Sequence, residues 1–171
     1  PIYRADGIYG ELEKQRYPKP GYPNPEVKIA TVDVATGSVE WIPMQDKDDH
    51  YLAFPRWNKK STVVYFQWLN RGQDHLKVFC WNPVAKKINT VYEEQQKTWV
   101  DLLDDEDLQL LENGDLLVRS SKSGWFHIYY VSKDGNSRAI TSGDWTVNSI
   151  NLVDEKTRQV YFSARKEAST D

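Results

Sequence analysis

The sequence predicts an all-β fold, a partial β-propeller of four-stranded antiparallel blades with about two whole blades and two partial ones. The composition favours strands, because seven Trp and ten Tyr stand against a single Met in 171 residues and aromatic residues are enriched in sheets. Strand-like segments are short and alternate with turn-forming residues. The pattern also repeats about every fifty residues, the period at which propeller blades recur.

Eight segments carry the strand signal, being short and rich in β-branched and aromatic residues. In chain order they are residues 27–34, 51–57, 62–69, 76–81, 115–121, 126–131, 145–150 and 159–165. Several lack a polar and apolar alternation, which suits strands covered on both faces by neighbouring blades. The one helix-like stretch, 101–111, carries an acidic cluster and is interpreted as a loop between strands.

A repeated unit of strand, polar turn and aromatic strand begins at Thr62 and at Asp115, with a truncated copy from Gln159. The expected units are a proline-rich, extended arm at 1–25 within a partial blade at 1–42, whole blades at 46–94 and 97–141, and a partial blade at 145–171. Fewer blades than closure requires leave open sheet edges. We therefore expect the segment to depend on further sequence or on a partner chain, and because it begins at Pro1 without an initiator Met we interpret both ends as cuts in a longer polypeptide.

Charge and cysteine content narrow the classes of partner. The net charge of −3 gives no basic field for phosphate backbones, so nucleic acid is not an expected partner. No apolar run reaches the roughly 18 residues of a membrane span. The single cysteine, Cys80, cannot form an internal disulfide and is interpreted as a small buried hydrophobe in preference to a reactive thiol.

No catalytic signature stands in the sequence. A Gly-x-Ser-x-Gly elbow is missing, so we expect no catalytic triad on this segment. His50, His75 and His127 stand far apart and are interpreted as strand or turn residues in preference to zinc ligands. The acidic run at 101–107 lacks the spacing of a calcium loop, so neither a metal nor another cofactor is expected.

Five motifs follow one another in an order that is more specific than any one of them. They are Tyr17-Pro18-Lys19-Pro20-Gly21 with Asn24-Pro25-x-Val27, Gln67-Trp68-Leu69-Asn70-Arg71-x-Gln73, Thr98-Trp99-Val100, Gly124-Trp125-x-His127-Ile128-x-Tyr130 and Ile140-Thr141-x-Gly143-x-Trp145-x-Val147. In sequence and order they resemble the N-terminal β-propeller of the dipeptidyl peptidase IV family, within the prolyl oligopeptidase superfamily of serine peptidases. The resemblance spans the chain from Tyr17 onward, and a bacterial member is expected.

The resemblance implies a noncatalytic propeller segment of a serine exopeptidase that removes N-terminal dipeptides with Pro or Ala at the second position. The segment would gate peptide substrates, shape the pocket rim and support a homodimer, next to a C-terminal α/β-hydrolase domain of the same chain. The family suggests a periplasmic, secreted or cell-surface location. A free-standing propeller that binds another protein is the alternative, and the reading frame beyond Asp171 would separate the two.

The resemblance also implies site residues. The pocket rim would lie just after Thr98-Trp99-Val100, at Leu102, Leu103 and Asp104, where vertebrate relatives commonly carry Arg-Phe-Arg. The dimer arm would use Ile2, Tyr3, Ile8 and Tyr9, with a loose terminus as the alternative. Tyr92-Glu93-Glu94 matches half of the family's Asp-Trp-x-Tyr-Glu-Glu motif for the substrate's amino terminus but lacks the Asp-Trp, so it is not assigned, and the true pair should precede Pro1.

Two further expectations concern stiffness and packing. Four prolines between Pro18 and Pro25 predict a polyproline-like spacer, since proline restricts its own backbone and that of the preceding residue. Trp99 and Trp145 are candidates for wedges packed between blades, where truncation to Ala would be costly.

Overall fold

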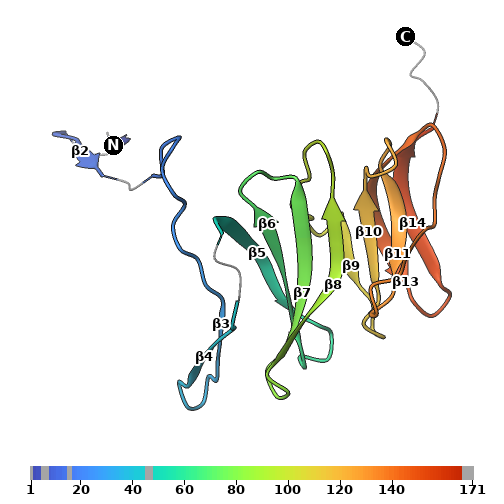
Figure 1. The fold of residues 1–171 in the computed structure, drawn as a ribbon, viewed down its shortest axis with the longest axis horizontal. Coiled ribbons are helices and arrows are strands. Elements are labelled where there is room, and N and C mark those ends of the chain that lie inside the picture. The colour runs from blue at the N-terminus through green and yellow to red at the C-terminus, as the bar shows by residue number, and fades with distance from the viewer. Residues whose placement is uncertain (1, 5–7, 15–16, 45–47, 167–171) are drawn as a thin grey trace, which may run out of the picture.

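The computed structural model describes residues 2–4, 8–14, 17–44 and 48–166, and within these ranges the chain consists of strands and turns (Figure 1). Fourteen strands lie in the described ranges. They are β1 (Ile2–Arg4), β2 (Glu11–Glu13), β3 (Ala30–Val32), β4 (Val39–Trp41), β5 (His50–Trp57), β6 (Val64–Asn70), β7 (His75–Asn82), β8 (Lys87–Gln95), β9 (Leu108–Leu110), β10 (Leu116–Ser120), β11 (His127–Val131), β12 (Ser137–Ala139), β13 (Thr146–Asp154) and β14 (Gln159–Arg165). The all-β prediction is confirmed.

Two sheets have the topology of a propeller blade. Strands β5 to β8 form one antiparallel sheet in chain order, and strands β9 to β12 form the other. The pairs β1–β2, β3–β4 and β13–β14 form two-stranded antiparallel sheets. Apart from the β1–β2 hairpin, the sheets follow one another side by side across the molecule (Figure 1). Each sheet is therefore a local meander, and the sheets stack through their side chains.

Strand β6 shows why the sheets stack. All of its residues from Val64 to Leu69 are buried, so both of its faces are covered. Val64 and Phe66 pack with Ile42 and Trp81 on the side of the β3–β4 sheet. Tyr65 and Leu69 pack on the other side, toward the β9–β12 sheet. A strand between two sheets needs apolar residues at successive positions, which accounts for the missing alternation in its sequence.

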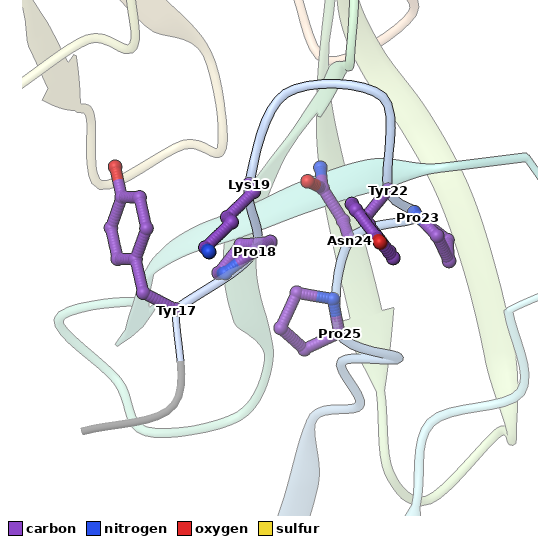
Figure 2. A pocket seen from close by; sticks show the side chains of 7 residues that line it. All are labelled: Tyr17, Pro18, Lys19, Tyr22, Pro23, Asn24 and Pro25. Carbon is purple, nitrogen blue, oxygen red and sulfur yellow. The ribbon is translucent and has the colours of Figure 1, made fainter. Parts of the chain in front are cut away.

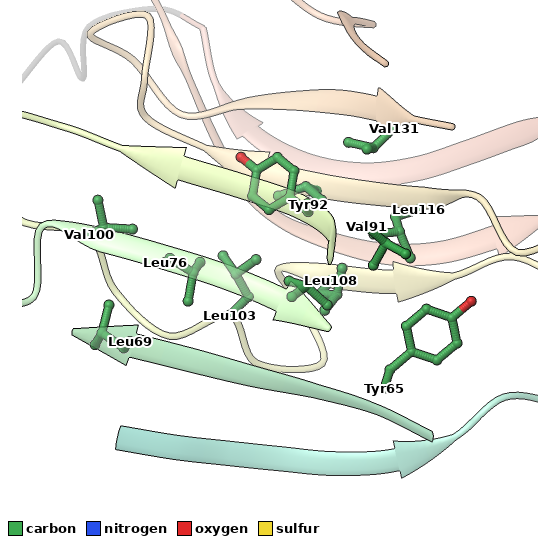
Figure 3. Packing of buried hydrophobic residues seen from close by; sticks show 12 residues of the cluster. Tyr65, Leu69, Leu76, Val91, Tyr92, Val100, Leu103, Leu108, Leu116 and Val131 are labelled. Carbon is green, nitrogen blue, oxygen red and sulfur yellow. The ribbon is translucent and has the colours of Figure 1, made fainter. Parts of the chain in front are cut away.

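The largest hydrophobic cluster fills the interface between the two four-stranded sheets (Figure 3). Leu76 and Val78 of β7 meet Leu116 and Val118 of β10, and all four side chains have no measurable exposure. Full burial of one such side chain contributes roughly 1.5–3 kcal/mol to the free energy of folding. A smaller cluster joins the β9–β12 sheet to β13–β14, and its buried members are Leu117, Ile128, Val147 and Ile150. The hydrophobic core thus lies in the interfaces between neighbouring sheets.

Six strands lie outside the eight segments with a strand signal. These are β1, β2, β4, β8, β9 and β12. Strand β8 contains charged and amide residues, yet it pairs with β7 along its whole length. Strand β9 lies inside the segment 101–111 that the sequence marks as a loop, and all three of its residues pair with β10. In each case the neighbouring strand supplies hydrogen bonds that outweigh a weak local preference.

The expectation that both tryptophans are wedges between blades is half wrong. Trp99 is 68% exposed, so its ring is not buried between the sheets. Trp145 is half-buried, packs edge-on against His127 with 5.1 Å between centroids, and stacks on Phe162 at 6.3 Å. A tryptophan that recurs with the blade period therefore need not be part of the core.

Cys80 and His127 are two further residues that are interpreted from the sequence as structural. Cys80 is half-buried against the largest cluster, and burial raises the pKa of its thiol, as suits a small hydrophobe. His127 is buried, with Nδ1 3.1 Å from the Thr141 hydroxyl and Nε2 2.9 Å from the Gly143 carbonyl oxygen. Within the described ranges there is no helix of the length and apolar character that crossing a membrane requires.

Candidate functional site

The segment between β8 and β9, residues 96–107, carries the three expected rim positions. Leu103 is buried in the largest hydrophobic cluster, and Leu102 is half-buried against the same cluster. Asp104 is exposed. Among the three expected rim residues, only Asp104 thus presents an exposed side chain, and the role of all three at a pocket rim stays a prediction.

Asp104 begins the turn that leads into β9. Its carboxylate accepts a hydrogen bond of 2.8 Å from the Glu106 amide, a common local bond for aspartate at a turn. Its carbonyl oxygen accepts hydrogen bonds from the amides of Asp107 and Leu108, at 3.2 and 3.0 Å. The chain therefore leaves the β5–β8 side and enters the next sheet at Asp104.

Side chains and backbone of the β5–β8 sheet hold the segment before this turn. The buried Gln67 side chain of β6 donates from Nε2 to the Leu103 carbonyl oxygen at 2.6 Å. Its Oε1 accepts from the Leu103 amide at 2.8 Å. The Val100 amide donates to the Gln73 carbonyl oxygen at 2.7 Å. The segment is thus tied to β6 and to the turn between β6 and β7, which precede it by about thirty residues in sequence.

Arg56 of β5 holds the turn from the other side. Its guanidinium donates to the Asp105 carboxylate at 2.7 Å and to the Leu108 carbonyl oxygen at 3.0 Å. A bulge precedes it, because three steps from Ala53 to Arg56 oppose two steps on β6. Phe54 within the bulge has a φ of 50°, an uncommon and strained value for a bulky side chain. The strained bulge therefore sets where the Arg56 side chain lies.

A small cavity of about 120 Å³ lies beside this segment, between the two four-stranded sheets. Its lining includes Glu94, Trp99, Asp107, Arg119 and Phe126. Arg119 donates from Nε to Asp107, and its guanidinium carbon lies 4.1 Å from the centre of the Phe126 ring. Burial raises the pKa of the Asp107 carboxyl, although the Arg119 guanidinium acts in the opposite direction. The cavity wall thus combines polar and apolar side chains, and Asp107 and Arg119 within it form an ion pair.

Glu93 and Glu94 do not form a paired site. They are neighbours on strand β8, and successive side chains of a strand point to opposite faces. Glu93 is exposed, with its carboxylate 2.6 Å from Nε2 of His75. Glu94 is buried and accepts hydrogen bonds from the Ser120 hydroxyl at 2.8 Å and from the Tyr92 hydroxyl. Two carboxylates that diverge in this way cannot hold one ammonium group together.

The proline-rich segment before β3 is anchored to the first four-stranded sheet and forms an apolar groove. Figure 2 shows the groove, which is lined by Tyr17, Pro18, Lys19, Tyr22, Pro23, Asn24 and Pro25. Asp49 accepts hydrogen bonds from the Asn24 amide at 3.1 Å and from Arg71 at 2.5 Å. The segment is not a straight spacer, because the Tyr22 amide bonds the Lys19 carbonyl oxygen at 3.0 Å and Gly21 takes a φ of 84°.

The expected dimer arm is described only in part. Residues 1, 5–7 and 15–16 lie outside the described ranges. Ile2 and Tyr3 belong to β1, which pairs with β2 opposite Glu13 and Leu12. Ile8 and Tyr9 are 97% and 93% exposed. The structure therefore gives the arm a short hairpin with two exposed apolar side chains, and its role in a dimer stays a prediction.

The two four-stranded antiparallel meanders stack face to face, and the connecting segment passes from the last strand of one to the first strand of the next. This arrangement defines the chain as part of a β-propeller. A family model described as "Dipeptidyl peptidase IV (DPP IV) N-terminal region" matches residues 1–171. The chain belongs to this family, which confirms both the resemblance seen in the sequence and the partial propeller.

Individual relatives agree with the family. The chain is 31% identical over 167 residues to a dipeptidyl peptidase 4 of Trichophyton equinum, covering 91% of this chain and 21% of that protein. It is 32% identical over 163 residues to dipeptidyl peptidase 4 of Arthroderma otae, with the same coverage of both chains. It thus spans about a fifth of the length of these curated relatives.

A solved structure is similar as well. The crystal structure of Porphyromonas gingivalis dipeptidyl peptidase 4 superimposes with a TM-score of 0.83 at 25% identity, covering 95% of this chain and 23% of that one. The curated relatives named above are fungal and this structure is bacterial, so a bacterial source for the present chain stays a prediction.

Proposed function

We propose that this chain is the noncatalytic propeller segment of a serine-type dipeptidyl peptidase. The parent hydrolase would remove dipeptides with Pro or Ala at the second position from free peptide N-termini. Family membership over all 171 residues is the observation that carries this proposal. The similarity to dipeptidyl peptidase 4 of fungi and of Porphyromonas gingivalis supports it.

The segment would contribute geometry to the reaction. A propeller beside a hydrolase site admits slender peptide ends, and confinement with orientation lowers the entropy cost of the chemical step. The stacked sheets form a stiff body, since their interfaces are packed apolar clusters. Asp104 and its neighbours would stand at the pocket rim, where an acidic side chain replaces the basic residues of vertebrate relatives.

The segment would also contribute contacts to the assembly. Its partners would be the C-terminal α/β-hydrolase domain of the same chain and a second copy of the whole protein. The exposed Ile8 and Tyr9 of the hairpin support an arm that reaches a second subunit, because interface cores are enriched in aromatic and apolar side chains.

The test compares the full-length parent with the isolated 171-residue segment. The full-length protein should release p-nitroaniline from Gly-Pro-p-nitroanilide in a reaction blocked by a serine-directed inhibitor, and the isolated segment should not. Turnover by the segment alone would refute a noncatalytic role. A reading frame that stops soon after the propeller closes, without a nucleophile elbow, would favour a free-standing binding module instead.

A further inference from the structure

A cavity of about 380 Å³ lies between the β9–β12 sheet and the β13–β14 sheet, at the end of the stack that carries the turns 111–115 and 155–158. Its volume falls within the range of small-molecule sites in proteins. This end is opposite to the one at which residues 96–107 enter β9. No residue of that segment lines the cavity, so the two features are separate.

The apolar part of the cavity wall lies at the margin of the hydrophobic cluster between these two sheets. Its members are Leu111, Leu117, Ile140, Val153 and Val160. Leu117 is a buried member of the cluster, and Leu111, Val153 and Val160 pack against it while partly buried. Apolar surface that a ligand can cover favours binding, because its removal from water is favourable. This wall therefore suits the apolar body of a small molecule.

Tyr130 of β11 and Arg138 of β12 form a polar part of the wall. The two residues are directly opposite each other in the sheet, so their side chains share one face. That face is the one toward β13–β14, because Tyr130 packs against the cluster between the sheets. The guanidinium carbon of Arg138 lies 5.0 Å from the centre of the Tyr130 ring. The attraction of a cation to an aromatic face thus holds this guanidinium at the cavity wall.

Arg158, in the turn between β13 and β14, brings a second guanidinium to the same cavity. Among the ion pairs of the described residues, none includes Arg138 or Arg158. Two acidic residues also line the cavity, and both have other partners. Asp154 accepts two hydrogen bonds from backbone amides of its own turn, and Glu155 accepts from Lys59 at 2.6 Å.

The balance of these charges favours an anion. Because Lys59 offsets the charge of Glu155, the two guanidinium groups face only the charge of Asp154. One positive charge is therefore left in the cavity. A guanidinium presents parallel N–H donors that match the two oxygens of a carboxylate, and such charge-assisted bonds are among the stronger ones in proteins.

We propose that this cavity binds a free small carboxylate with an apolar body. Arg138 and Arg158 hold the carboxylate, and the apolar side chains of the two sheets cover the rest of the ligand. The inference is independent of the proposed function, because it uses none of the residues expected at the pocket rim or in the dimer arm. It assigns a ligand class to the end of the stack that lies away from the segment 96–107.

The test measures binding of 3-phenylpropionate to the full-length protein by saturation-transfer NMR. The expected dissociation constant is about 0.1–3 mM, as the size of the ligand implies. The neutral amide 3-phenylpropanamide has nearly the same shape and lacks the charge. It should bind at least about ten-fold more weakly, since it cannot form charge-assisted bonds to the guanidinium groups.

Variants of the two arginines test their role. Arg138→Gln and Arg158→Asn should each weaken binding of 3-phenylpropionate about three- to ten-fold. Asparagine is chosen because Arg158 has a φ of 57°, a conformation that asparagine adopts readily. Lys156→Gln is the matched control, since Lys156 belongs to the same turn and does not line the cavity. All three positions are exposed, so the variants should fold as the wild type does, and the control should bind as tightly.

Hydrogen exchange locates the bound ligand. With saturating 3-phenylpropionate, amides of residues 137–140 and 153–160 should exchange about two- to five-fold more slowly than in the free protein, because the ligand opposes opening of the sheets at this end. The same ligand concentration should give little protection in Arg158→Asn. Protection confined to other parts of the full-length protein would place the ligand elsewhere and overturn the assignment.

The binding data can contradict the inference in three further ways. Equal affinity for the acid and its amide, or no binding of the acid, would remove the carboxylate from the ligand class. An equal loss of affinity in Lys156→Gln and Arg158→Asn would indicate a general charge effect without a specific site. Tighter binding of acetyl-Ala-Phe than of 3-phenylpropionate would assign the cavity to a peptide C-terminus in place of a free small acid.

Discussion

Individual side chains in this chain are placed by specific partners, and residue type alone does not reveal their role. Trp99 and Trp145 both follow a repeated unit of the sequence. Only Trp145 packs into an interface, where its neighbours are His127 and Phe162. A side chain added at Gly143, which has a φ of 126°, would come within 2.6 Å of the Trp145 ring nitrogen. The glycine and the tryptophan are therefore matched to each other.

The two tryptophans should respond differently to truncation. Trp145→Ala should lower the free energy of unfolding by about 2 kcal/mol, less than for a fully buried ring, because it removes a half-buried side chain. Trp99→Ala should change it by no more than about 0.5 kcal/mol. Urea unfolding of both variants measures the difference. Equal losses would contradict the exposure seen for Trp99.

The carboxyl group of Asp115 should make the free energy of unfolding depend on pH in the acid range. Burial acts to raise the pKa of its carboxyl, but donors from Tyr130, the Lys133 amide and Asn113 outweigh burial and hold it below the ordinary value. Since the folded pKa lies below the unfolded one, the stabilisation is present above the unfolded pKa of 3.8 and is lost as the pH falls through the folded value.

Asp115→Asn should therefore be less stable than the wild type at neutral pH, and the difference should shrink as the pH falls below about 4. Free energies of unfolding of both proteins between pH 2 and 7 check this. Asp134→Asn, at an exposed position in the turn after β11, is a suitable control and should give a small difference at every pH. A constant difference for Asp115→Asn would mean that the carboxylate charge does not matter.

The elements differ in how they are held. Strand β6 lies between two neighbours and is buried on both faces, whereas the proline-rich segment before β3 contributes to no sheet and depends on a few polar contacts. Its attachment to the first four-stranded sheet includes Asp49, which contacts both Asn24 and Arg71. Elements with few buried contacts open most readily, so this segment should be locally less stable than the sheets.

Asp49→Ala should release the segment 17–25 without unfolding the sheets. The expected result is faster cleavage of the full-length protein within residues 17–25 by a protease of broad specificity, because the backbone there loses its contact with β5 and the neighbouring turn. Mass spectrometry of the fragments locates the cut. Asp33→Ala, which disturbs a separate turn between β3 and β4, is the control, and an equal increase there would argue against a specific anchor.

At the scale of the whole molecule, the two sheets at the ends of the stack have exposed apolar side chains on their outer faces. Leu152 of β13 and Tyr161 of β14 lie opposite each other and are 59% and 52% exposed. Val32, Val39 and Trp41 are likewise exposed on β3 and β4 at the other end of the stack. Exposed apolar pairs on a sheet face are typical of a surface that another layer covers. We expect the adjoining blades of the full-length protein to cover both faces.

Substitution of both Leu152 and Tyr161 by lysine should act in opposite directions in the two forms of the protein. In the isolated segment it should reduce self-association, measured by light scattering, because it removes an exposed apolar pair. In the full-length protein it should lower the melting temperature, since two charges would enter a packed interface. A full-length protein with an unchanged melting temperature would mean that this face stays in solvent.

Much of the fold follows from local sequence. The aromatic and β-branched runs at 62–69 and 126–131 identify β6 and β11 without further information. Strand β8 is harder, because its lysine, glutamate and glutamine residues give it a polar sequence, and its pairing with β7 is decided at a distance. The rim segment is similar: the motif Thr98-Trp99-Val100 locates it in the sequence, but it does not indicate that Leu103 would be buried.

The sequence by itself determined the all-β class, the blade period and the family, because these depend on residue types and on the order of motifs along the chain. The tertiary structure decided which tryptophan is buried, how Glu93 and Glu94 diverge, and which side chain holds Leu103. These outcomes depend on contacts between residues far apart in sequence, as Gln67 and Leu103 are. A local pattern carries no information about such a contact until stacking of the sheets brings the two residues together.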